Sequence, residues 1–244
     1  MQDKDLEKKQ TFIEHLLELR SCLIKAFIGW MVAAVFVYVF SDKILEFIIT
    51  PLRPYLDSES KVYFRGLADV FSTQIKLSAI LGFILSSPYI IYQLWLFVAP
   101  GLYPHEKKWL SYTIIFTSFS FLTGALTAYY LFLPFLLNFF YSFGEKFLVF
   151  KPYLKEYISF LLRILLLFGI FFQVPSVLFL LNKLNIFTLE QLKHFRPYAI
   201  ILSFVFSGLI TTGVDPLNQI LIALPLTFLY EIGIILIKLT NLRR

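Results

Sequence analysis

The chain has 244 residues, 58% of them hydrophobic, and its mean hydropathy is +0.75. Soluble domains are roughly 45–50% apolar, so the composition excludes an ordinary soluble protein. The formal net charge of +6 would suggest a nucleic acid partner for a soluble chain. Here the charge is better explained by basic loops at a membrane surface, and we expect no nucleic acid partner. With Cys22 as the single cysteine, no internal disulfide is possible.

The first 20 residues combine charge with apolar side chains three and four positions apart. This spacing predicts a short amphipathic helix over 3–20 that lies at the membrane interface and runs into the first span. The segment has no apolar core followed by a small-residue cleavage site, so it does not resemble a signal peptide. We therefore expect the first span itself to direct insertion.

Six long apolar runs account for most of the remaining chain. A helix needs about 20 apolar residues to cross a hydrocarbon core of roughly 30 Å. The runs are almost continuously apolar and do not alternate as barrel strands do, which favours helices. We predict an all-α integral membrane protein with a single domain over 1–244. Its spans are 21–41, 73–98, 109–140, 157–182, 197–212 and 218–238.

The runs differ in length, which indicates that the helices of the bundle differ in height across the membrane. At 1.5 Å per residue, 109–140 is about 48 Å long and 197–212 about 24 Å. A short span thins the bilayer or hides its ends against neighbours. We expect a concave, cupped bundle with two short C-terminal spans. Prolines predict kinks in four of the helices: Pro88, Pro134, Pro175 and Pro225.

Basic residues are concentrated at both termini and in alternate loops. The other loops carry fewer cations, and these are mixed with acidic residues. The positive-inside rule therefore places both termini in the cytoplasm.

Two segments on the predicted cytoplasmic side carry carboxylates among apolar and basic residues. Residues 12–20 read FIEHLLELR, and residues 95–108 read WLFVAPGLYPHEKK. Glu18 and Glu106 are suited to bind arginine, because a guanidinium meets two carboxylate oxygens in a bidentate fork. The alternative is that they form interfacial ion pairs with the nearby Arg20, Lys107 and Lys108.

These two segments resemble TatC, the receptor subunit of the twin-arginine protein translocase. The resemblance continues in order along essentially the whole chain. Further matching segments are DVF (69–71), SPYIIYQ (87–93), FGIFFQVP (168–175), RPY (196–198), Asp215, ALP (223–225) and YEIG (230–233).

The resemblance implies a receptor for folded proteins that bear an Arg-Arg signal peptide. Such a receptor recruits TatA and TatB, uses the proton-motive force, forms an oligomer with other TatC copies and lies in the bacterial inner membrane. It implies no enzyme activity, cofactor or metal. By position, Glu18 and Glu106 match the family's acidic residues that hold the arginine pair. The residues that would shape the same site are His15, Arg20, Phe97, Pro100, Leu102 and Tyr103.

Polar residues inside or between the later spans form a second set. Gln173 lies in the fourth span, where the family often has Glu, so a carboxylate proton relay at this position is excluded. We expect its amide to provide a polar spot on the concave face for a partner helix or signal peptide, or else an interhelical hydrogen bond. Glu231 lies deep in the last span and should face protein or water. By resemblance, Thr212, Asp215 and Gln219 belong to a polar cluster where TatA and TatB dock, although Asp before proline is also a common turn residue.

Two other function classes fit the sequence less well. A small-solute secondary transporter would need several ionisable groups near the midplane and discontinuous helices, for which only Gln173 and Glu231 are candidates. An intramembrane enzyme would need a motif such as HExxH, GxSxG or a pair of intramembrane aspartates, and the sequence has none of them.

Overall fold

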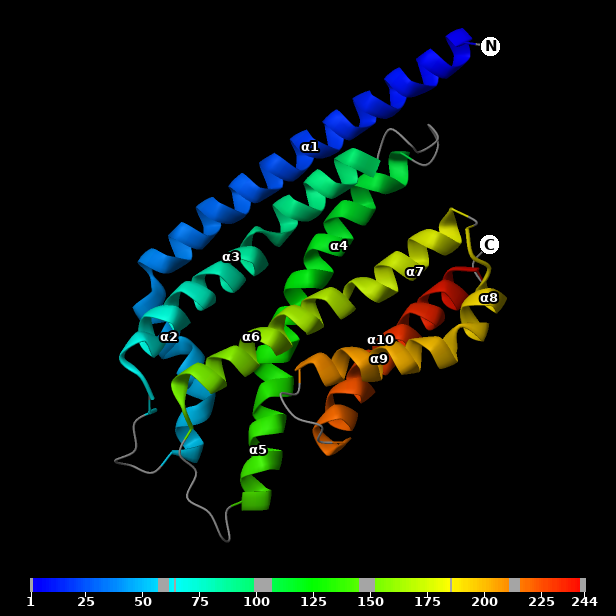
Figure 1. The fold of residues 1–244 in the computed structure, drawn as a ribbon. Helices are drawn as coiled ribbons and strands as arrows, with labels where there is room; N and C mark the ends of the chain where they lie inside the picture. The colour runs from blue at the N-terminus through cyan, green and yellow to red at the C-terminus, as the bar shows by residue number, and fades with distance from the viewer. Residues whose placement is uncertain are drawn as a thin grey trace.

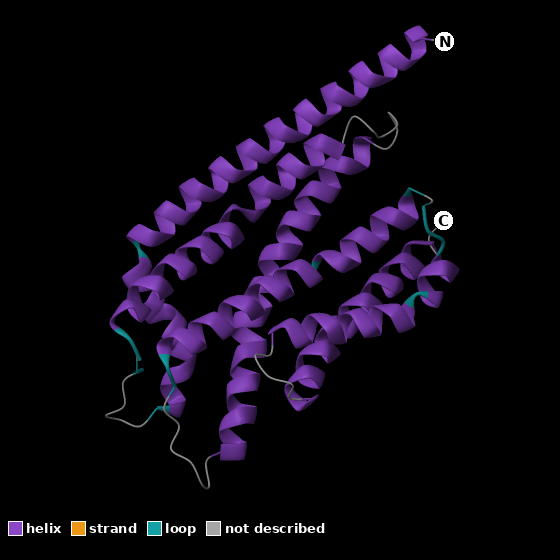
Figure 2. Ribbon diagram, in the orientation of Figure 1, coloured by secondary structure: helices purple, strands orange, loops and turns teal. Residues whose placement is uncertain are grey.

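The computed structural model describes residues 2–56, 62–63, 65–98, 107–144, 152–184, 186–210 and 216–241. Within these ranges the regular structure is helical (Figure 2). Tyr63 and Tyr153 form an isolated β-bridge. Five helical stretches are long and apolar enough to cross a membrane: His15–Val39, Ala68–Phe97, Ile114–Ser142, Leu154–Lys183 and Gln219–Thr240. They correspond to the first four and the sixth predicted spans, while Arg196–Leu209 is a shorter apolar helix.

The first helix, α1 (Gln2–Val39), is continuous. It contains no proline, and it passes residue 20 without the boundary that a separate interfacial helix would require. The segment 3–20 is therefore the N-terminal part of the same rod as the first span (Figure 1).

The chain folds into two short helices directly after α1. It forms α2 (Ser41–Ile49) and the 3₁₀ helix η1 (Thr50–Tyr55). Two tyrosine hydroxyls from distant helices donate hydrogen bonds to carbonyls of α2: Tyr129 to Phe47 at 2.7 Å and Tyr157 to Ile48 at 2.9 Å. These bonds hold the folded segment against the helical core.

The second span is α3 (Leu67–Val98), which continues through Pro88. The third consists of α4 (Lys107–Thr127), a π-helical segment η3 (Ala128–Phe132) and α5 (Leu133–Gly144). The irregular segment directly precedes Pro134, which has no N–H to donate to the carbonyl four residues back. The predicted interruption is therefore present, as a π-bulge within the long span.

The fourth span is divided at Phe172 into α6 (Leu154–Phe171) and α7 (Gln173–Lys183). Pro175 explains the division, because it cannot donate to the carbonyl of Phe171. The division places Gln173 at the first position of α7.

The C-terminal part corrects one prediction and adds one element. The sequence predicts two short spans, but only α9 (Arg196–Ile210, 15 residues) is short, since α10 (Pro216–Asn241) has 26 residues. Pro216 begins α10 at the position where proline is tolerated, and the helix continues past the apolar run. The short helix α8 (Leu189–His194) was not predicted, although Thr188 and Gln191 form its capping box.

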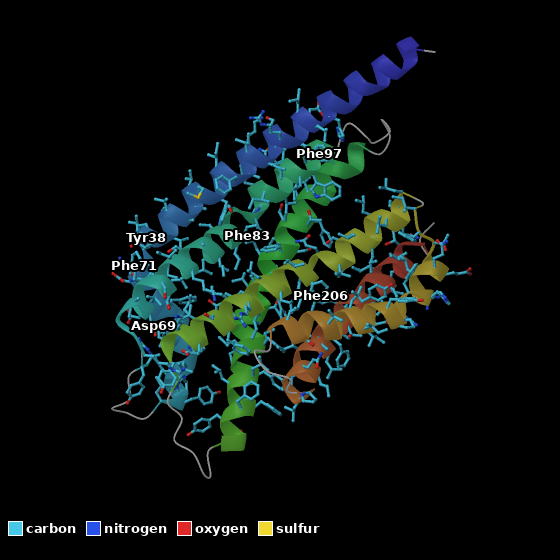
Figure 3. The ribbon with its side chains drawn as sticks, viewed as in Figure 1. Tyr38, Asp69, Phe71, Phe83, Phe97 and Phe206 are labelled. Atoms are coloured by element: carbon cyan, nitrogen blue, oxygen red, sulfur yellow. The ribbon has the colours of Figure 1, made fainter. Side chains whose placement is uncertain are left out.

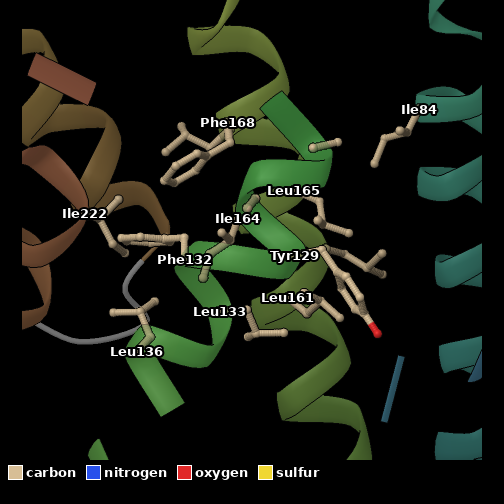
Figure 4. Packing of buried hydrophobic residues seen from close by; sticks show 14 of the residues in the cluster. Ile84, Tyr129, Phe132, Leu133, Leu136, Leu161, Ile164, Leu165, Phe168 and Ile222 are labelled. Atoms are coloured by element: carbon tan, nitrogen blue, oxygen red, sulfur yellow. The ribbon is translucent and has the colours of Figure 1, made fainter. Parts of the chain in front are cut away.

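The helices form an open arrangement around a central core. α1 packs along α3, α4 contacts α3 and α6, and α10 contacts α7 and α9 (Figure 1). The core lies where α6, η3 and α5 meet α10, and its close packing is visible in Figure 4. Residues that are fully buried or nearly so include Leu133, Leu136, Ile158, Leu161, Ile164 and Ile222. Large apolar side chains on the outer helix surfaces are exposed instead, as expected where lipid is the solvent.

Candidate functional site

The end of the molecule formed by α1 and the last turn of α3 brings together three of the predicted receptor residues. The ring of His15 stacks on Phe97, with centroids 4.3 Å apart and an interplanar angle of 20° (Phe97 is labelled in Figure 3). The Nδ1 atom of His15 lies 3.6 Å from a carboxylate oxygen of Glu18, one helical turn further along α1. The side chain of Glu18 is 58% exposed, so its oxygens are accessible to a ligand.

The other predicted residues of this site are only partly placed. Arg20 is exposed on α1. It is two positions from Glu18, and residues with that separation point to different sides of a helix. The structure therefore does not bring Arg20 to the same face as Glu18. Glu106, Pro100, Leu102 and Tyr103 lie outside the described residues.

A cavity of about 360 Å³ opens between α3, α4 and the α6–α7 junction. Its lining is mostly apolar, with Gln173, Thr117 and Ser87 among the few polar members. The Nε2 atom of Gln173 donates a 2.8 Å hydrogen bond to the carbonyl of Thr117, and Trp95 donates from Nε1 to the Thr117 hydroxyl at 3.3 Å. Hydrogen bonds therefore link side chains of α3 and α7 to Thr117 of α4. The interhelical hydrogen bond expected as one role of Gln173 is present.

A second apolar cavity, of about 440 Å³, lies between α1 and α3. It shares Phe83 and Ile90 with the first, so α3 contributes to the walls of both (Phe83 is labelled in Figure 3). Trp30, which also lines it, donates from Nε1 to the carbonyl of Ala79 at 2.8 Å. The two cavities together give this region an apolar surface with its polar groups largely hydrogen-bonded.

Glu231 faces another part of the same chain, in agreement with the prediction that it faces protein or water. Its carboxylate lies 2.7 Å from the guanidinium of Arg196, the first residue of α9. Beside it, the hydroxyl of Tyr230 donates to the carbonyl of Leu192 in α8 at 2.7 Å. These contacts tie α8 and the start of α9 to α10.

Gln219, one of the three residues of the predicted docking cluster, also bridges two helices. Its amide donates to the carbonyl of Phe204 in α9 at 2.8 Å. Thr212 and Asp215 lie outside the described residues. The structure thus gives Gln219 a role in pairing α10 with α9.

Two cations inside apolar spans were missed by the sequence reasoning. Lys76 lies on α3 and Arg163 on α6, and both are half-buried. The signal was present, because a basic residue within an apolar run is costly and marks a functional candidate. Among the described residues, no group of three or more His, Cys, Asp or Glu side chains could hold a metal ion.

Comparison with known proteins gives a consistent result. The family model described as TatC, Sec-independent protein translocase protein, matches residues 14–225. The Sec-independent protein translocase protein TatC of Aquifex aeolicus is 37% identical over 95% of this chain and 96% of its own length. The corresponding protein of Desulforapulum autotrophicum is 37% identical over 94% of this chain and 84% of its own length.

A solved structure agrees with these relatives. The crystal structure of a twin-arginine translocase receptor, TatC, superposes with a TM-score of 0.83 at 37% identity. The superposition covers 93% of this chain and 99% of that one. Sequence and fold therefore agree over nearly the whole length.

Proposed function

Because this chain belongs to the TatC family of Sec-independent protein translocase proteins, a family of membrane translocase components rather than enzymes, we propose that it binds the paired arginines of a signal peptide through Glu18 and Glu106. The binding site would lie at the end of the molecule formed by α1 and α3.

The observation that carries this proposal is that the carboxylate of Glu18 is accessible to a ligand. Its carboxylate is exposed, and its neighbour His15 approaches no closer than 3.6 Å. The stacking of His15 on Phe97 holds that neighbour to one side. A guanidinium can therefore reach both carboxylate oxygens of Glu18 in the bidentate geometry that distinguishes arginine from lysine.

Two further features favour a cation here. α3 ends at Val98, directly after Phe97, and the C-terminal end of a helix carries a partial negative charge. Glu106 immediately precedes Lys107, the first residue of α4, so a second carboxylate is close in sequence to the neighbouring helix end. Two cations of the ligand would then have two anionic partners.

The direct test is binding of a fluorescent twin-arginine signal peptide to the detergent-solubilised protein. A charge-assisted hydrogen bond contributes about 1.5–3 kcal/mol, so Glu18→Gln or Glu106→Gln should weaken binding roughly 10- to 150-fold. A Lys-Lys version of the peptide should bind more weakly to the unaltered protein, because an ammonium cannot form the bidentate fork.

Glu190→Gln is the matched control, since Glu190 is an exposed carboxylate on α8. It should leave the affinity unchanged. Equal binding of both peptides by every variant would remove the proposed recognition chemistry.

For the topology, we propose six crossings with both termini in the cytoplasm of a bacterial inner membrane. This rests on the distribution of basic residues and on α9 as the fifth crossing. A 15-residue helix is shorter than the roughly 20 residues that a normal core requires. Local thinning of the bilayer beside α9 would accommodate this short helix, and α9 would form the lowest side of a cupped bundle.

For the apolar cavity beside Gln173, we propose that it accepts the apolar part of a signal peptide or a partner helix. The amide of Gln173 would lie at its polar point. Export of a twin-arginine reporter in cells should fall in the Gln173→Leu variant. Unchanged export would mean that Gln173 has only the interhelical role.

For the partner subunits, we propose that TatA and TatB dock near Thr212, Asp215 and Gln219, and that several TatC copies share one complex. A photo-crosslinker at Gln219 should capture a TatA or TatB helix, whereas one at Val32, on the exposed face of α1, should not. Equal capture at both positions would contradict the assignment.

A further inference from the structure

Gln93, near the C-terminal end of α3, carries a buried polar atom without a hydrogen-bond partner. The residue is only 5% exposed, and its Oε1 atom accepts no hydrogen bond within the described part of the chain. Thr73 Oγ1, near the start of α3, is the other such side-chain atom among the described residues. Buried polar side-chain atoms in folded proteins mostly have a hydrogen-bond partner, so each exception needs an explanation.

The helical period places Gln93 on the side of α3 that faces α1. Gln93 lies four residues after Tyr89 and four residues before Phe97. Phe97 stacks on His15 of α1, and the ring of Tyr89 is so close to Gly29 of α1 that an added Cβ would lie 2.5 Å from it. Residues four apart share one face of a helix, so Gln93 is buried in the contact between the two helices.

Gln93 and Glu18 lie at a similar level of the molecule. The helices α1 and α3 run side by side in opposite directions (Figure 1). Glu18 follows His15 by three residues, about 4.5 Å along α1, and Gln93 precedes Phe97 by four residues, about 6 Å along α3. Both therefore lie about one turn beyond the stacked rings, in the same direction. A ligand bound at Glu18 would be at the level of Gln93.

An apolar cavity gives a ligand room beside Gln93. Ile90, one turn before Gln93 on α3, lines the cavity of about 440 Å³ between α1 and α3. Leu23, five residues after Glu18, lines the same cavity from α1. All of its lining residues lie in candidate membrane spans. The cavity is therefore within two helical turns of both Glu18 and Gln93, and it suits an apolar ligand.

The apolar segment of a signal peptide has the donors that Gln93 lacks. In signal peptides an apolar segment follows the basic region. When that segment is helical, the N–H groups of its first turn have no acceptor within the helix. Such groups are costly inside a bilayer, where no water replaces the acceptor. Donors of the peptide and the unpaired acceptor of the protein would therefore satisfy one another.

We propose that the Oε1 atom of Gln93 accepts a backbone N–H from the first turn of the apolar segment of a bound signal peptide. This inference rests on the proposed binding of the arginine pair, which brings that turn next to Glu18. The Gln93 side chain turns toward the cavity between α1 and α3 as the peptide enters. Because the contact is to the peptide backbone, it does not distinguish arginine from lysine.

The test is titration of the detergent-solubilised protein with fluorescent signal peptides. Gln93→Leu should weaken binding about 2- to 13-fold, the range of one neutral hydrogen bond. The Arg-Arg and Lys-Lys peptides should lose the same factor. A peptide with amide-to-ester replacements in the first turn of its apolar segment lacks the N–H donors. It should lose the same factor with the unaltered protein and nothing further with Gln93→Leu, as a double-mutant cycle requires for interacting groups.

The melting temperature separates this role from a structural one. Replacing an unpaired buried polar group by an apolar group of similar size removes a desolvation cost. Gln93→Leu should therefore keep or raise the melting temperature of the peptide-free protein while it weakens binding. Thr73→Val is the matched control, because it removes the other unpaired atom, 20 residues earlier and about 30 Å along α3. It should leave the affinity for the peptide unchanged.

Several outcomes would overturn the proposal. Unchanged affinity in Gln93→Leu, or an equal loss in Thr73→Val, would mean that Gln93 does not contact the peptide. Further loss of the ester peptide with Gln93→Leu would mean that the N–H has another acceptor. Gln93→Met, with an unbranched side chain, repeats each comparison, and a lower melting temperature in both Gln93 variants would show that the amide is already hydrogen-bonded in the free protein.

The two proposals can fail separately. If Glu18→Gln leaves binding unchanged but the cycle between Gln93 and the peptide N–H holds, the arginine site fails and the Gln93 contact stands. If Glu18→Gln weakens binding and the cycle shows no coupling, the Gln93 contact fails and the arginine site stands.

Discussion

Glu18 and Glu231 are both carboxylates close to membrane-spanning segments, yet the fold treats them in opposite ways. Glu231 lies 2.7 Å from Arg196 and is 36% exposed, whereas Glu18 is 58% exposed with His15 at 3.6 Å. Glu231 has a strong cationic partner within the chain, and Glu18 retains most of its capacity to bind a ligand. A carboxylate is a candidate for recognition when the fold leaves its charge uncompensated.

The helix pairs that carry these residues are also built differently. α1 and α3 approach closely at Gly82, where an added Cβ would lie 2.5 Å from the Cα of Ala34. α9 and α10 are joined at a comparable glycine, Gly208, by the side chain of Gln219. The first interface depends on backbone proximity and the second on side-chain hydrogen bonds, so the two should respond differently to substitution.

The largest effect is expected from reversing the charge at Glu18. Glu18→Arg removes the acceptor and adds a like charge facing the arginines of the signal, so the affinity for the peptide should fall more than about 100-fold. Glu231→Gln should leave the affinity within about 2-fold, because Glu231 is already paired with Arg196. Peptide titration with both variants measures the contrast. Similar losses in the two would mean that binding senses overall charge rather than the Glu18 site.

The second effect concerns packing. Gly82→Ala should lower the free energy of unfolding by about 1–3 kcal/mol, because the methyl group must push α1 away from α3. Signal peptide binding should weaken as well, since His15 and Phe97 lie on these two helices.

The matched control is Gly208→Ala, whose Cβ would meet the side chain of Gln219, with Nε2 at 3.2 Å and Cδ at 3.9 Å. A shift of this side chain by a few tenths of an ångström relieves the contact, so the change should be about a few tenths of a kcal/mol, and higher helix propensity offsets it. Thermal unfolding in detergent compares the two variants. Equal destabilisation would contradict the difference between the two interfaces.

A smaller effect is expected at the α6–α7 junction. Gln173→Leu removes the hydrogen bond to Thr117, and interhelical hydrogen bonds in membranes contribute about 0.6 kcal/mol on average. A modest fall in the melting temperature should follow, with the proposed signal-binding carboxylates unaffected. A loss comparable to that of Gly82→Ala would show that the junction, and not only one bond, depends on Gln173.

The smallest effect is expected for the ion pair between Arg196 and Glu231, which is partly exposed to solvent. A double-mutant cycle with Arg196→Gln and Glu231→Gln should give a coupling of about 0.2–1 kcal/mol, the range of partly exposed ion pairs. Added salt should reduce it. A coupling of several kcal/mol would mean that the pair is desolvated in the membrane.

Several features could be predicted from the sequence because their causes are local. Pro134 and Pro175 lack the N–H that a regular helix requires, so the interruptions at η3 and Phe172 follow from chain chemistry. The short α9 follows from the length of an apolar run. The length of α10 was underestimated, because a helix continues into polar residues when its backbone bonds and neighbours favour it.

The proposed signal-binding site was predictable only in part. Glu18, His15 and Phe97 were assigned to it because they match a family pattern, but the stacking of His15 on Phe97 depends on how α1 packs against α3. Arg20 was assigned to the same site, although the helical period turns it to another side of α1.

The sequence by itself determined the solvent, the helical class, the family and the helix interruptions at Pro134 and Pro175, because apolar length, proline chemistry and motif order are properties of the chain alone. At Pro88 and Pro225, where kinks were also predicted, α3 and α10 continue without interruption. Only the tertiary structure decided which partners the charged side chains meet. Arg196 pairs with Glu231 across 35 residues, and Lys76 donates a hydrogen bond to Ser159 across 83. Such pairings depend on which helix faces come together, and no local rule of spacing or propensity specifies them.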